Sequence, residues 1–259
     1  MLTTIERRQE IVKKTNMVGK VDVAELAAEY QVSTVTIRND LNHLNKKGLV
    51  VRSRGGAVIN SRIAKELSVK EKHCKHLPVK QKLAAVAASL ISDGELIILD
   101  SGTTTEEIAK QLHHHNNLVV MTNGLNIAAE LAVSDGTEVI ITGGTLRKKS
   151  LSFYGRQAEA SLINLRFDKV FLGVDGIDEK AGLTTHFEHE ANLNRIMCEI
   201  SKEVVVITDS SKFNRNGFYV ISSLDEIDTL LTDSRIPQSY IDYLESKHVN
   251  VIIVPHPDD

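Results

Sequence analysis

The sequence has few cysteines and no long apolar run. These two features argue against a disulfide-rich protein and against a membrane-spanning protein. Only Cys74 and Cys198 occur among the 259 residues, far apart and without the spacing of metal ligands, which favours two reduced thiols over a disulfide. No apolar segment approaches the roughly 20 residues of a membrane-spanning helix. The first residues, MLTTIERRQEIVKK, are polar where a secretory signal would be apolar. We therefore expect a cytoplasmic protein with no membrane partner.

The sequence also gives no indication of a metal or another cofactor. Its one histidine run, residues 113–115, is interpreted as a solvated loop rather than a metal site. No internal repeat or low-complexity tract is evident. We expect no cofactor and no metal ligand.

Charge is divided unevenly along the chain. Residues 1–82 carry 17 basic and 8 acidic side chains, whereas the remainder carries 14 and 26. Such a split is typical of a small basic module that binds a polyanion, joined to an acidic body. A solvated basic face is the alternative explanation, so the charge split needs support from a DNA-reading helix.

Residues 1–58 are predicted to form a winged helix-turn-helix domain. Asp22 precedes one short helix as its cap, and Ser33 caps the next helix, which ends at Gly48. Two strand-like pieces, LVVRS and AVIN, flank a turn formed by Arg54, Gly55 and Gly56.

The third predicted helix has an apolar stripe formed by Ile37, Leu41 and Leu44, which should pack on the preceding helices. The opposite face suits a major groove, because arginine can pair with guanine, asparagine with adenine, and valine can contact a thymine methyl group. The predicted reading residues are Thr34, Val35, Thr36, Arg38, Asn39 and Asn42. The helix start at Ser33 and the wing residues Arg52 and Arg54 are predicted to contact phosphate. An ordinary solvated face, or a module without sequence preference, remains the alternative.

A polar, basic linker is predicted at residues 59–80, followed by an α/β domain at residues 81–259. Six apolar runs rich in Val and Ile alternate there with helical patterns: ELIILD, NLVVMT, TEVIITGG, KVFLGVD, EVVVITD and NVIIVP. Continuous apolar runs indicate strands buried on both faces, and hence a largely parallel sheet covered by helices. The fold class is therefore α/β with an N-terminal winged helix-turn-helix.

Polar residues follow several of these strands, where parallel sheets bind ligands. In DSGTTTEEIA a glycine turn leads into a helix start, and hydroxyls with unpaired backbone N–H groups there suit an anion, although a simple helix cap has the same sequence. Other strand ends at the same sheet edge add polar groups that can converge on one ligand. The predicted ligand-binding residues are Asp100, Ser101, Gly102, Thr103, Thr104, Asn123, Gly124, Gly143, Asp175, Gly176, Glu190 and Lys212. Lys212 is the candidate partner of a phosphate, and Glu190 of ligand hydroxyls or of Arg195.

Several motifs in order carry a family resemblance. EYQVSTVTIRNDLNHLNKKGLVVRSRGGAV, DSGTTTEEIA, MTNGLNIA, TGGTLRKKS, FLGVDGID and TDSSKFNR resemble the DeoR-type sugar-operon repressors over nearly the whole chain. SFYGRQAE, GLTTHFEHEANLNRIMCE and VVVITDSSKFNR are most similar to repressors of N-acetylgalactosamine and galactosamine utilisation. The resemblance implies a DNA-binding repressor that is relieved by a phosphorylated sugar.

The family's C-terminal domain is similar in fold to ribose-5-phosphate isomerase. That resemblance matches DSGTT to the enzyme's phosphate loop and DGID, residues 175–178, to its acidic loop. The enzyme's glycine-rich segment with a catalytic lysine is missing, because this chain has DEKAGLTTHFEHE, with Lys180 but no glycine run. The expectation is a non-enzymatic homo-oligomer that binds operator DNA, and the rival is a sugar-phosphate isomerase or deaminase with an accessory DNA-binding domain.

Overall fold

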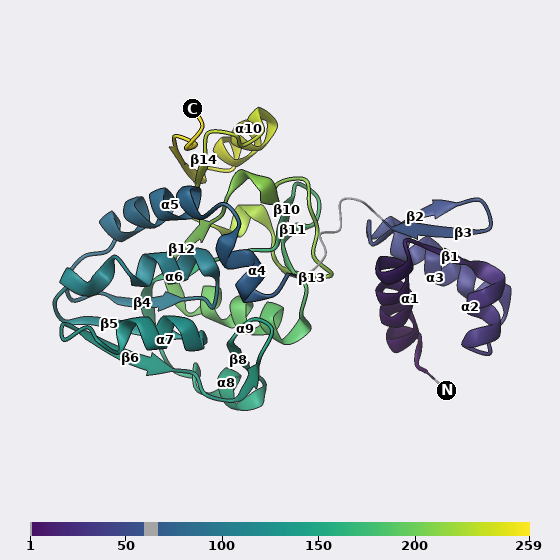
Figure 1. Cartoon of the computed structure of the whole chain (residues 1–259), viewed down its shortest axis with the longest axis horizontal. Coiled ribbons are helices and arrows are strands. Elements are labelled where there is room, and N and C mark those ends of the chain that lie inside the picture. Colours follow the sequence, from purple (N-terminus) through teal and green to yellow (C-terminus); the bar gives the residue numbers. More distant parts are fainter. Residues whose placement is uncertain (1, 60–66) are drawn as a thin grey trace. The chain divides into compact units, whose positions relative to one another are not determined.

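The structure is a computed structural model that describes residues 2–59 and 67–259 (Figure 1). The chain divides into two compact units, residues 1–65 and 66–259. Of the predicted linker at residues 59–80, positions 60–66 lie outside the described residues. The remainder contains α4 (Val69–Cys74) and the first turn of α5 (Leu77–Ser89), which belong to the C-terminal unit. Within the described ranges, no helix has the length and apolar character to cross a lipid bilayer.

The N-terminal unit combines helices with an antiparallel sheet of order β1-β3-β2, which agrees with a winged helix-turn-helix. The short β1 was not predicted, because three residues are too few to show an alternating pattern. The elements of this unit are α1 (Thr4–Val18), β1 (Lys20–Asp22), α2 (Val23–Glu29), α3 (Thr34–Lys46), β2 (Val50–Ser53) and β3 (Gly56–Ile59).

The helices α2 and α3 begin at the predicted cap residues, and α3 ends two residues before Gly48. Asp22 caps α2 by accepting a hydrogen bond from the backbone N–H of Ala24 at 2.7 Å. Ser33 caps α3 by accepting one from the N–H of Thr36 at 3.1 Å. Just after α3, Gly48 has a φ of 69°, a left-handed conformation that glycine adopts without steric cost.

The buried stripe of α3 contains a charged residue among its apolar ones. Ile37, Leu41 and Leu44 are buried, as predicted, and Asp40 on the same face is only 2% exposed. The two carboxylate oxygens of Asp40 accept hydrogen bonds from the Nε atoms of Arg7 and Arg8 in α1, each at 2.7 Å. A buried charge therefore ties α1 to α3.

The C-terminal unit is built on a seven-stranded parallel sheet of order β15-β14-β12-β9-β4-β5-β6. Six of these strands are the predicted apolar runs. The seventh, β14, was missed because TLLTD is short and polar at both ends. The strands are β4 (Leu96–Leu99), β5 (Leu118–Thr122), β6 (Thr137–Ile141), β9 (Phe167–Leu172), β12 (Ser201–Ile207), β14 (Thr229–Asp233) and β15 (Asn250–Val254).

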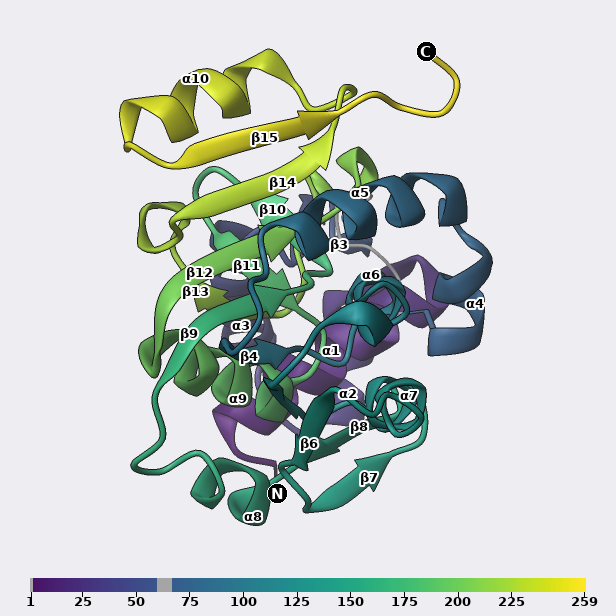
Figure 2. The ribbon, with the colours of Figure 1, turned by 90° about the vertical axis from the view of Figure 1, so that its left-hand side faces the viewer.

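Helices cover both faces of this sheet, so that alternate strand residues enter two separate buried clusters (Figure 2). α5, α6 (Thr103–Ala109) and α7 (Leu125–Leu131) pack against the face that carries Ile97 and Leu99. The other face, which carries Ile98, is covered by α8 (Arg156–Ala160), α9 (Glu188–Glu199) and α10 (Gln238–Ser246).

Shorter strands and turns complete the unit. Five strands of three or four residues lie outside the predicted set, because runs this short show no clear period. They form a hairpin, β7 (Thr145–Arg147) with β8 (Ser152–Tyr154), and a small antiparallel sheet of β10 (Gly176–Asp178), β11 (Gly182–Thr185) and β13 (Tyr219–Ser222). Single 3-10 turns occur at Leu112–His114, Ser210–Lys212 and Leu224–Glu226.

The strand order creates one switch point in the main sheet. After β4 the chain adds β5 and β6 on one side, and then returns to place β9 on the other side of β4. The loops after β4 and β9 therefore leave the sheet edge next to each other, which is where open parallel sheets bind ligands.

Candidate functional site

The N-terminal unit presents a polar helix face to solvent. Val35 is 60% exposed, and Thr34, Arg38, Asn39 and Asn42 are exposed as well. Thr36 is half-buried, and its hydroxyl lies 2.9 Å from that of Ser33. The apolar stripe holds α3 in this orientation, so the predicted reading residues form one accessible surface. Their contact with bases stays a prediction.

The two wing arginines differ in their surroundings. Arg52 is half-buried, its Nη1 donates to the carbonyl of Gly56 at 2.6 Å, and its backbone N–H donates to Asn45 Oδ1 at 2.9 Å. Arg52 therefore holds the wing together through one of its guanidinium nitrogens. Arg54 is exposed at the tip, beside Gly55 with a φ of 82°, and is better placed for a DNA phosphate.

The C-terminal unit contains a pocket of about 160 Å³ at the switch point of its sheet. The loops after β4, β9 and β12 supply much of the lining, and α4, the start of α5, Glu190 of α9 and Ser150 of the β7–β8 hairpin supply the rest. Eight of the predicted ligand-binding residues line this pocket: Asp100, Ser101, Gly102, Thr103, Thr104, Asp175, Glu190 and Lys212.

Asp100 organises the loops at the switch point. Its Oδ1 accepts a hydrogen bond from the N–H of Ser101 at 2.5 Å, and its Oδ2 accepts one from the N–H of Gly173 at 3.1 Å. Burial raises the pKa of Asp100 to about 6, against the effect of these hydrogen bonds. The carboxylate thus fastens the loop after β4 to the loop after β9, and Ser101 and the threonines line the pocket beside it.

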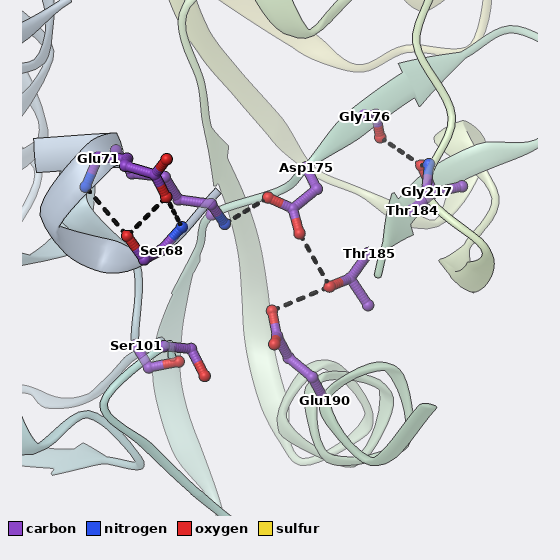
Figure 3. Close-up of polar contacts among 12 residues, drawn as sticks. Ser68, Glu71, Ser101, Asp175, Gly176, Thr184, Thr185, Glu190 and Gly217 are labelled. Carbon is purple, nitrogen blue, oxygen red and sulfur yellow. Dashed lines mark hydrogen bonds and ion pairs between the residues drawn. The ribbon is translucent and has the colours of Figure 1, made fainter. Parts of the chain in front are cut away.

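A chain of polar contacts crosses the pocket (Figure 3). Lys72 Nζ donates to Asp175 Oδ1 at 2.5 Å, and the Thr185 hydroxyl lies 3.2 Å from Asp175 Oδ2 and 3.0 Å from Glu190 Oε1. Burial opposes the charge of Asp175, but the positive charges of Lys72, His186 and Lys212 outweigh it and hold the pKa of this carboxyl below its ordinary value.

Thr185 has one hydroxyl proton and cannot donate to two carboxylates at once. Burial, together with the negative charges of Asp175 and Asp100, raises the pKa of Glu190 to about 8. The Thr185 hydroxyl therefore donates to one carboxyl group at a time, and a protonated Glu190 can in turn donate to Thr185 while Thr185 donates to Asp175. When Glu190 is protonated, the two carboxyl groups together carry one negative charge, and Lys72 balances it.

Basic side chains are the largest charged group in the lining. Burial lowers the pKa of Lys80 to about 8, and its Nζ donates to the backbone carbonyl of Lys72 at 2.5 Å. Burial also lowers the pKa of Lys212, against the pull of Asp175 and Asp209. The basic residues in the lining are Lys72, Lys75, Lys80, Lys212 and Arg215, and the acidic ones are Asp100, Asp175, Glu190 and Asp209. With Glu190 neutral, the pocket carries an excess of positive charge that suits an anion.

Four predicted ligand-binding residues do not line the pocket: Asn123, Gly124, Gly143 and Gly176. The first three follow β5 and β6, one and two strands away from the switch point. Asn123 Nδ2 lies 3.5 Å from Ser101 Oγ, and a Cβ on Gly124 would lie 3.1 Å from Ser101 Cα, so both act on the Ser101 loop from behind. A Cβ on Gly176 would lie 2.3 Å from the carbonyl oxygen of Arg215. Only glycine there lets the segment after Lys212 approach β10.

Sequence reasoning missed the contribution of α4 and α5. Lys72, Lys75, His76 and Lys80 line the pocket, although their segment was interpreted as a linker. One signal was available in SVKE, because Ser68 and Glu71 have the spacing of a capping box and form one at the start of α4. Asp209 and Arg215 were also missed, although both flank the predicted Lys212.

The described residues contain no group of His, Cys, Asp and Glu side chains arranged to hold a metal ion. Asp178, which follows the acidic loop, accepts hydrogen bonds from the N–H groups of Lys180 and Ala181 at 3.0 and 3.1 Å. It therefore closes the β10–β11 turn and does not line the pocket.

Family models match both units. The DeoR-like helix-turn-helix domain matches residues 7–63, and the DeoR C terminal sensor domain matches residues 75–234. A relative named "Putative aga operon transcriptional repressor", from Escherichia coli O157:H7, is 47% identical over 97% of this chain and 94% of its own. The glycerol-3-phosphate regulon repressor of Escherichia coli strain K12 is 31% identical over 95% of this chain and 97% of its own.

Solved structures give a weaker likeness, and only of fold. A D-ribose-5-phosphate isomerase in complex with phospho-erythronic acid is 16% identical, with a TM-score of 0.39 over 57% of this chain and 55% of that chain. The family matches, in contrast, cover both units in order, and the relatives match over nearly their whole length. This chain therefore belongs to the DeoR family, with an N-terminal helix-turn-helix domain and a C-terminal sensor domain.

Proposed function

We propose that the protein is a DNA-binding transcriptional repressor of an amino-sugar utilisation operon, and that a phosphorylated sugar bound in the sensor pocket relieves repression. The observation that carries the ligand proposal is the convergence of Lys72, Lys75, Lys80, Lys212 and Arg215 on one pocket that is also lined by serine and threonine hydroxyls. The name of the aga operon relative supports the choice of operon.

Operator recognition is assigned to the exposed face of α3. Arg38 can form paired hydrogen bonds with a guanine, Asn39 or Asn42 with an adenine, and Val35 can contact a thymine methyl group. Arg54 at the wing tip and the backbone at the start of α3 contact phosphate and fix the register. One such helix reads too few base pairs for a unique genomic address, so we propose a homo-oligomer that reads repeated half-sites.

Ligand recognition follows from the chemistry of the pocket lining. A phosphate is dianionic near neutral pH and forms charge-assisted hydrogen bonds with ammonium and guanidinium groups, each about 1.5–3 kcal/mol. The backbone N–H of Lys212 donates to the carbonyl of Asp209 at 3.1 Å. Its ammonium makes no hydrogen bond or ion pair with the residues that the structure describes, and is therefore available to the phosphate. Glu190 and Asp175, which both contact Thr185, provide acceptors for the hydroxyl or amine groups of the sugar.

We infer that the pocket binds its ligand without converting it. An isomerase needs a base aimed at a substrate C–H bond and a group that stabilises the enediolate. Asp100 is engaged by backbone N–H groups, Asp178 closes a turn, and Glu190 shares a proton with Thr185 and Asp175. The names of the relatives, which are transcriptional regulators, agree with a role without turnover.

Repression and ligand binding are coupled reciprocally in this scheme. A ligand releases DNA only if it binds more tightly to a conformation with weaker operator affinity. The factor by which ligand weakens operator binding then equals the factor by which operator weakens ligand binding.

An operator-binding titration tests the proposal. Operator DNA is first selected from a random duplex library with the full chain. It is then titrated by fluorescence anisotropy in the presence of hexosamine 6-phosphates, N-acetylhexosamine 6-phosphates and ketohexose 6-phosphates. We expect at least one phosphorylated sugar to weaken binding while its unphosphorylated form does not. Equal effects of free and phosphorylated sugars would contradict the anion assignment.

A turnover assay with the same sugar phosphates tests the enzymatic rival. We expect no conversion above the rate in buffer. Conversion at ordinary enzymatic rates, about 1–10³ per second, would restore the isomerase or deaminase interpretation.

A further inference from the structure

The helix α4 forms part of the pocket but has little hydrophobic attachment to the sensor domain. Val69 and Lys72 of this six-residue helix line the pocket, with Leu67 just before it and Lys75 just after it. None of the α4 side chains is buried. Among the residues that the structure describes, α4 is the first helix after the helix-turn-helix domain. A ligand in the pocket therefore touches the first described helix on the C-terminal side of the DNA-binding domain.

Polar contacts hold α4 in place. The N–H of Val69 donates to the carbonyl of Lys149 at 2.9 Å, and His73 Nδ1 lies 3.5 Å from Glu106 Oε2. The side chain of Lys72 donates to Asp175, and its carbonyl accepts the ammonium of Lys80. Lys72 is thus bound at both its side chain and its backbone, which makes it the centre of this attachment.

The Lys72–Asp175 pair differs from an ordinary surface ion pair. The side chain of Asp175 is 8% exposed and that of Lys72 is 24% exposed, so water screens their attraction only in part. A buried carboxylate left without its cation is strongly destabilised. The empty pocket therefore favours the position of α4 in which Lys72 reaches Asp175.

We propose that Lys72 is a positioning residue that couples the pocket to the DNA-binding domain: an anionic ligand competes with Asp175 for its ammonium and thereby displaces α4. This inference rests on the proposed function, because it requires an anion in the pocket. Beyond the proposed function, it names Lys72 and α4 as the residue and the helix that respond when a ligand enters the pocket.

The charge balance supports this competition. A bound phosphate adds about −1.5 to −2 charges beside a carboxyl pair that already carries one, so one ammonium then has two anionic partners. When the Lys72 ammonium turns from Asp175 toward the phosphate, α4 loses one of the polar contacts that hold it against the sensor domain, and the helix can shift. No buried side chain of α4 resists this movement. The ligand therefore makes different contacts in the two positions of α4, which is the condition for a population shift.

The test compares Lys72→Met with Lys70→Met in the full chain. Both variants remove one lysine charge from α4, but Lys70 is exposed and does not line the pocket. Operator affinity is measured with and without saturating galactosamine 6-phosphate, and with inorganic phosphate as a second probe. Wild type and Lys70→Met should lose operator affinity about 5–150-fold on adding the sugar phosphate. Lys72→Met should lose less than twofold, and its operator affinity without ligand should already be reduced.

Hydrogen exchange provides a readout that a simple loss of ligand affinity would not change. In the wild type, galactosamine 6-phosphate should alter exchange at the backbone amides of residues 72–75. In Lys72→Met these amides should exchange rapidly whether or not the ligand is present, and Lys72→Arg should restore the wild-type response.

The outcomes separate this inference from the proposed function. If the sugar phosphate releases operator from Lys72→Met by the same factor as from wild type, Lys72 is not the coupling residue, although the repressor assignment stands. If neither inorganic phosphate nor any of the sugar phosphates used to test the proposed function binds the wild type, the proposed function and this inference fail together. Unchanged exchange at residues 72–75 on ligand binding would also overturn the inference.

Discussion

Substitution of Asp40 should strongly destabilise the helix-turn-helix domain while leaving the sensor domain intact. Asp40 is 2% exposed and Arg7 is 6% exposed, so Asp40→Ala leaves the Arg7 guanidinium in the interior without its anion. Breaking a buried pair from one side costs about 3–5 kcal/mol. Small domains have total stabilities of about 5–15 kcal/mol, and one of this size lies near the lower end. The variant should therefore lose most of its operator binding at 37 °C.

Urea denaturation of the full chain, followed by circular dichroism, measures this change. Two transitions are expected, and only the transition of the helix-turn-helix domain should move to lower urea, while calorimetric binding of the sugar phosphate stays at the wild-type level. Glu10→Ala is the matched control, because the Glu10–Lys13 pair at 3.6 Å is exposed and should leave both transitions unchanged.

A triple variant tests the physical reason. Arg7→Met, Arg8→Met and Asp40→Leu together remove all three charges and fill the space with apolar groups, which is often neutral or stabilising for a buried ion pair. Its transition should return close to that of the wild type. A loss below about 1 kcal/mol in Asp40→Ala, or a triple variant as unstable as the single one, would refute the argument.

The remaining predictions concern DNA and the pocket. Arg38→Ala should lose about 1–3 kcal/mol of binding to the selected operator but little binding to random DNA, as anisotropy with both duplexes will show. Arg54→Ala should weaken binding to all sequences and reduce the salt slope by about 1, and an unchanged slope would remove Arg54 from the phosphate contacts. Because the folded pKa of Glu190, about 8, lies above its ordinary value of 4.5, its contribution to sensor-domain stability falls as pH rises through this window. Glu190→Gln should flatten that fall in thermal midpoints between pH 5 and 8, and an identical slope would contradict the buried proton. Gly176→Ala, which places a Cβ 2.3 Å from a backbone oxygen, should cost about 1–3 kcal/mol of sensor-domain stability and weaken ligand binding, as urea titration and calorimetry will test.

Local patterns predicted those parts of the fold that depend on neighbours in sequence. The spacing of Ile37, Leu41 and Leu44 determined which face of α3 is buried, and six apolar runs identified six strands of the main sheet. The same spacing places Asp40 on the buried face, so its need for a cationic partner was visible. The identity of that partner was not visible, since Arg7 and Arg8 approach it only when α1 packs on α3.

The sequence predicted those pocket-lining residues that follow a strand, and it did not predict the lining residues of α4 and α5. Asp100, Ser101 and Asp175 directly follow or nearly follow β4 and β9, so their place at the sheet edge follows from the parallel topology. Lys72 and Lys80 come from a segment without strand or strong amphipathic pattern, and their role depends on how α4 and α5 fold back over the sheet edge. Asn123 and Gly143 lie at the same edge of the sheet but do not line the pocket. The apolar runs alone could not separate them from the lining residues, because the runs do not reveal the order of the strands in the sheet.

The placement of β4 beside β9 has a consequence for synthesis on the ribosome. Ile97 of β4 is in register with Lys169, so this pairing waits until β5, β6 and the β7–β8 hairpin have been translated. Non-local pairings of this kind fold slowly, whereas the contacts of the helix-turn-helix domain join residues that are closer in sequence. We therefore expect the first domain to fold while the nascent chain still displays an unpaired apolar strand, a period during which aggregation competes with completion of the sheet. Chaperone capture should accordingly concentrate on nascent chains that end between β4 and β9.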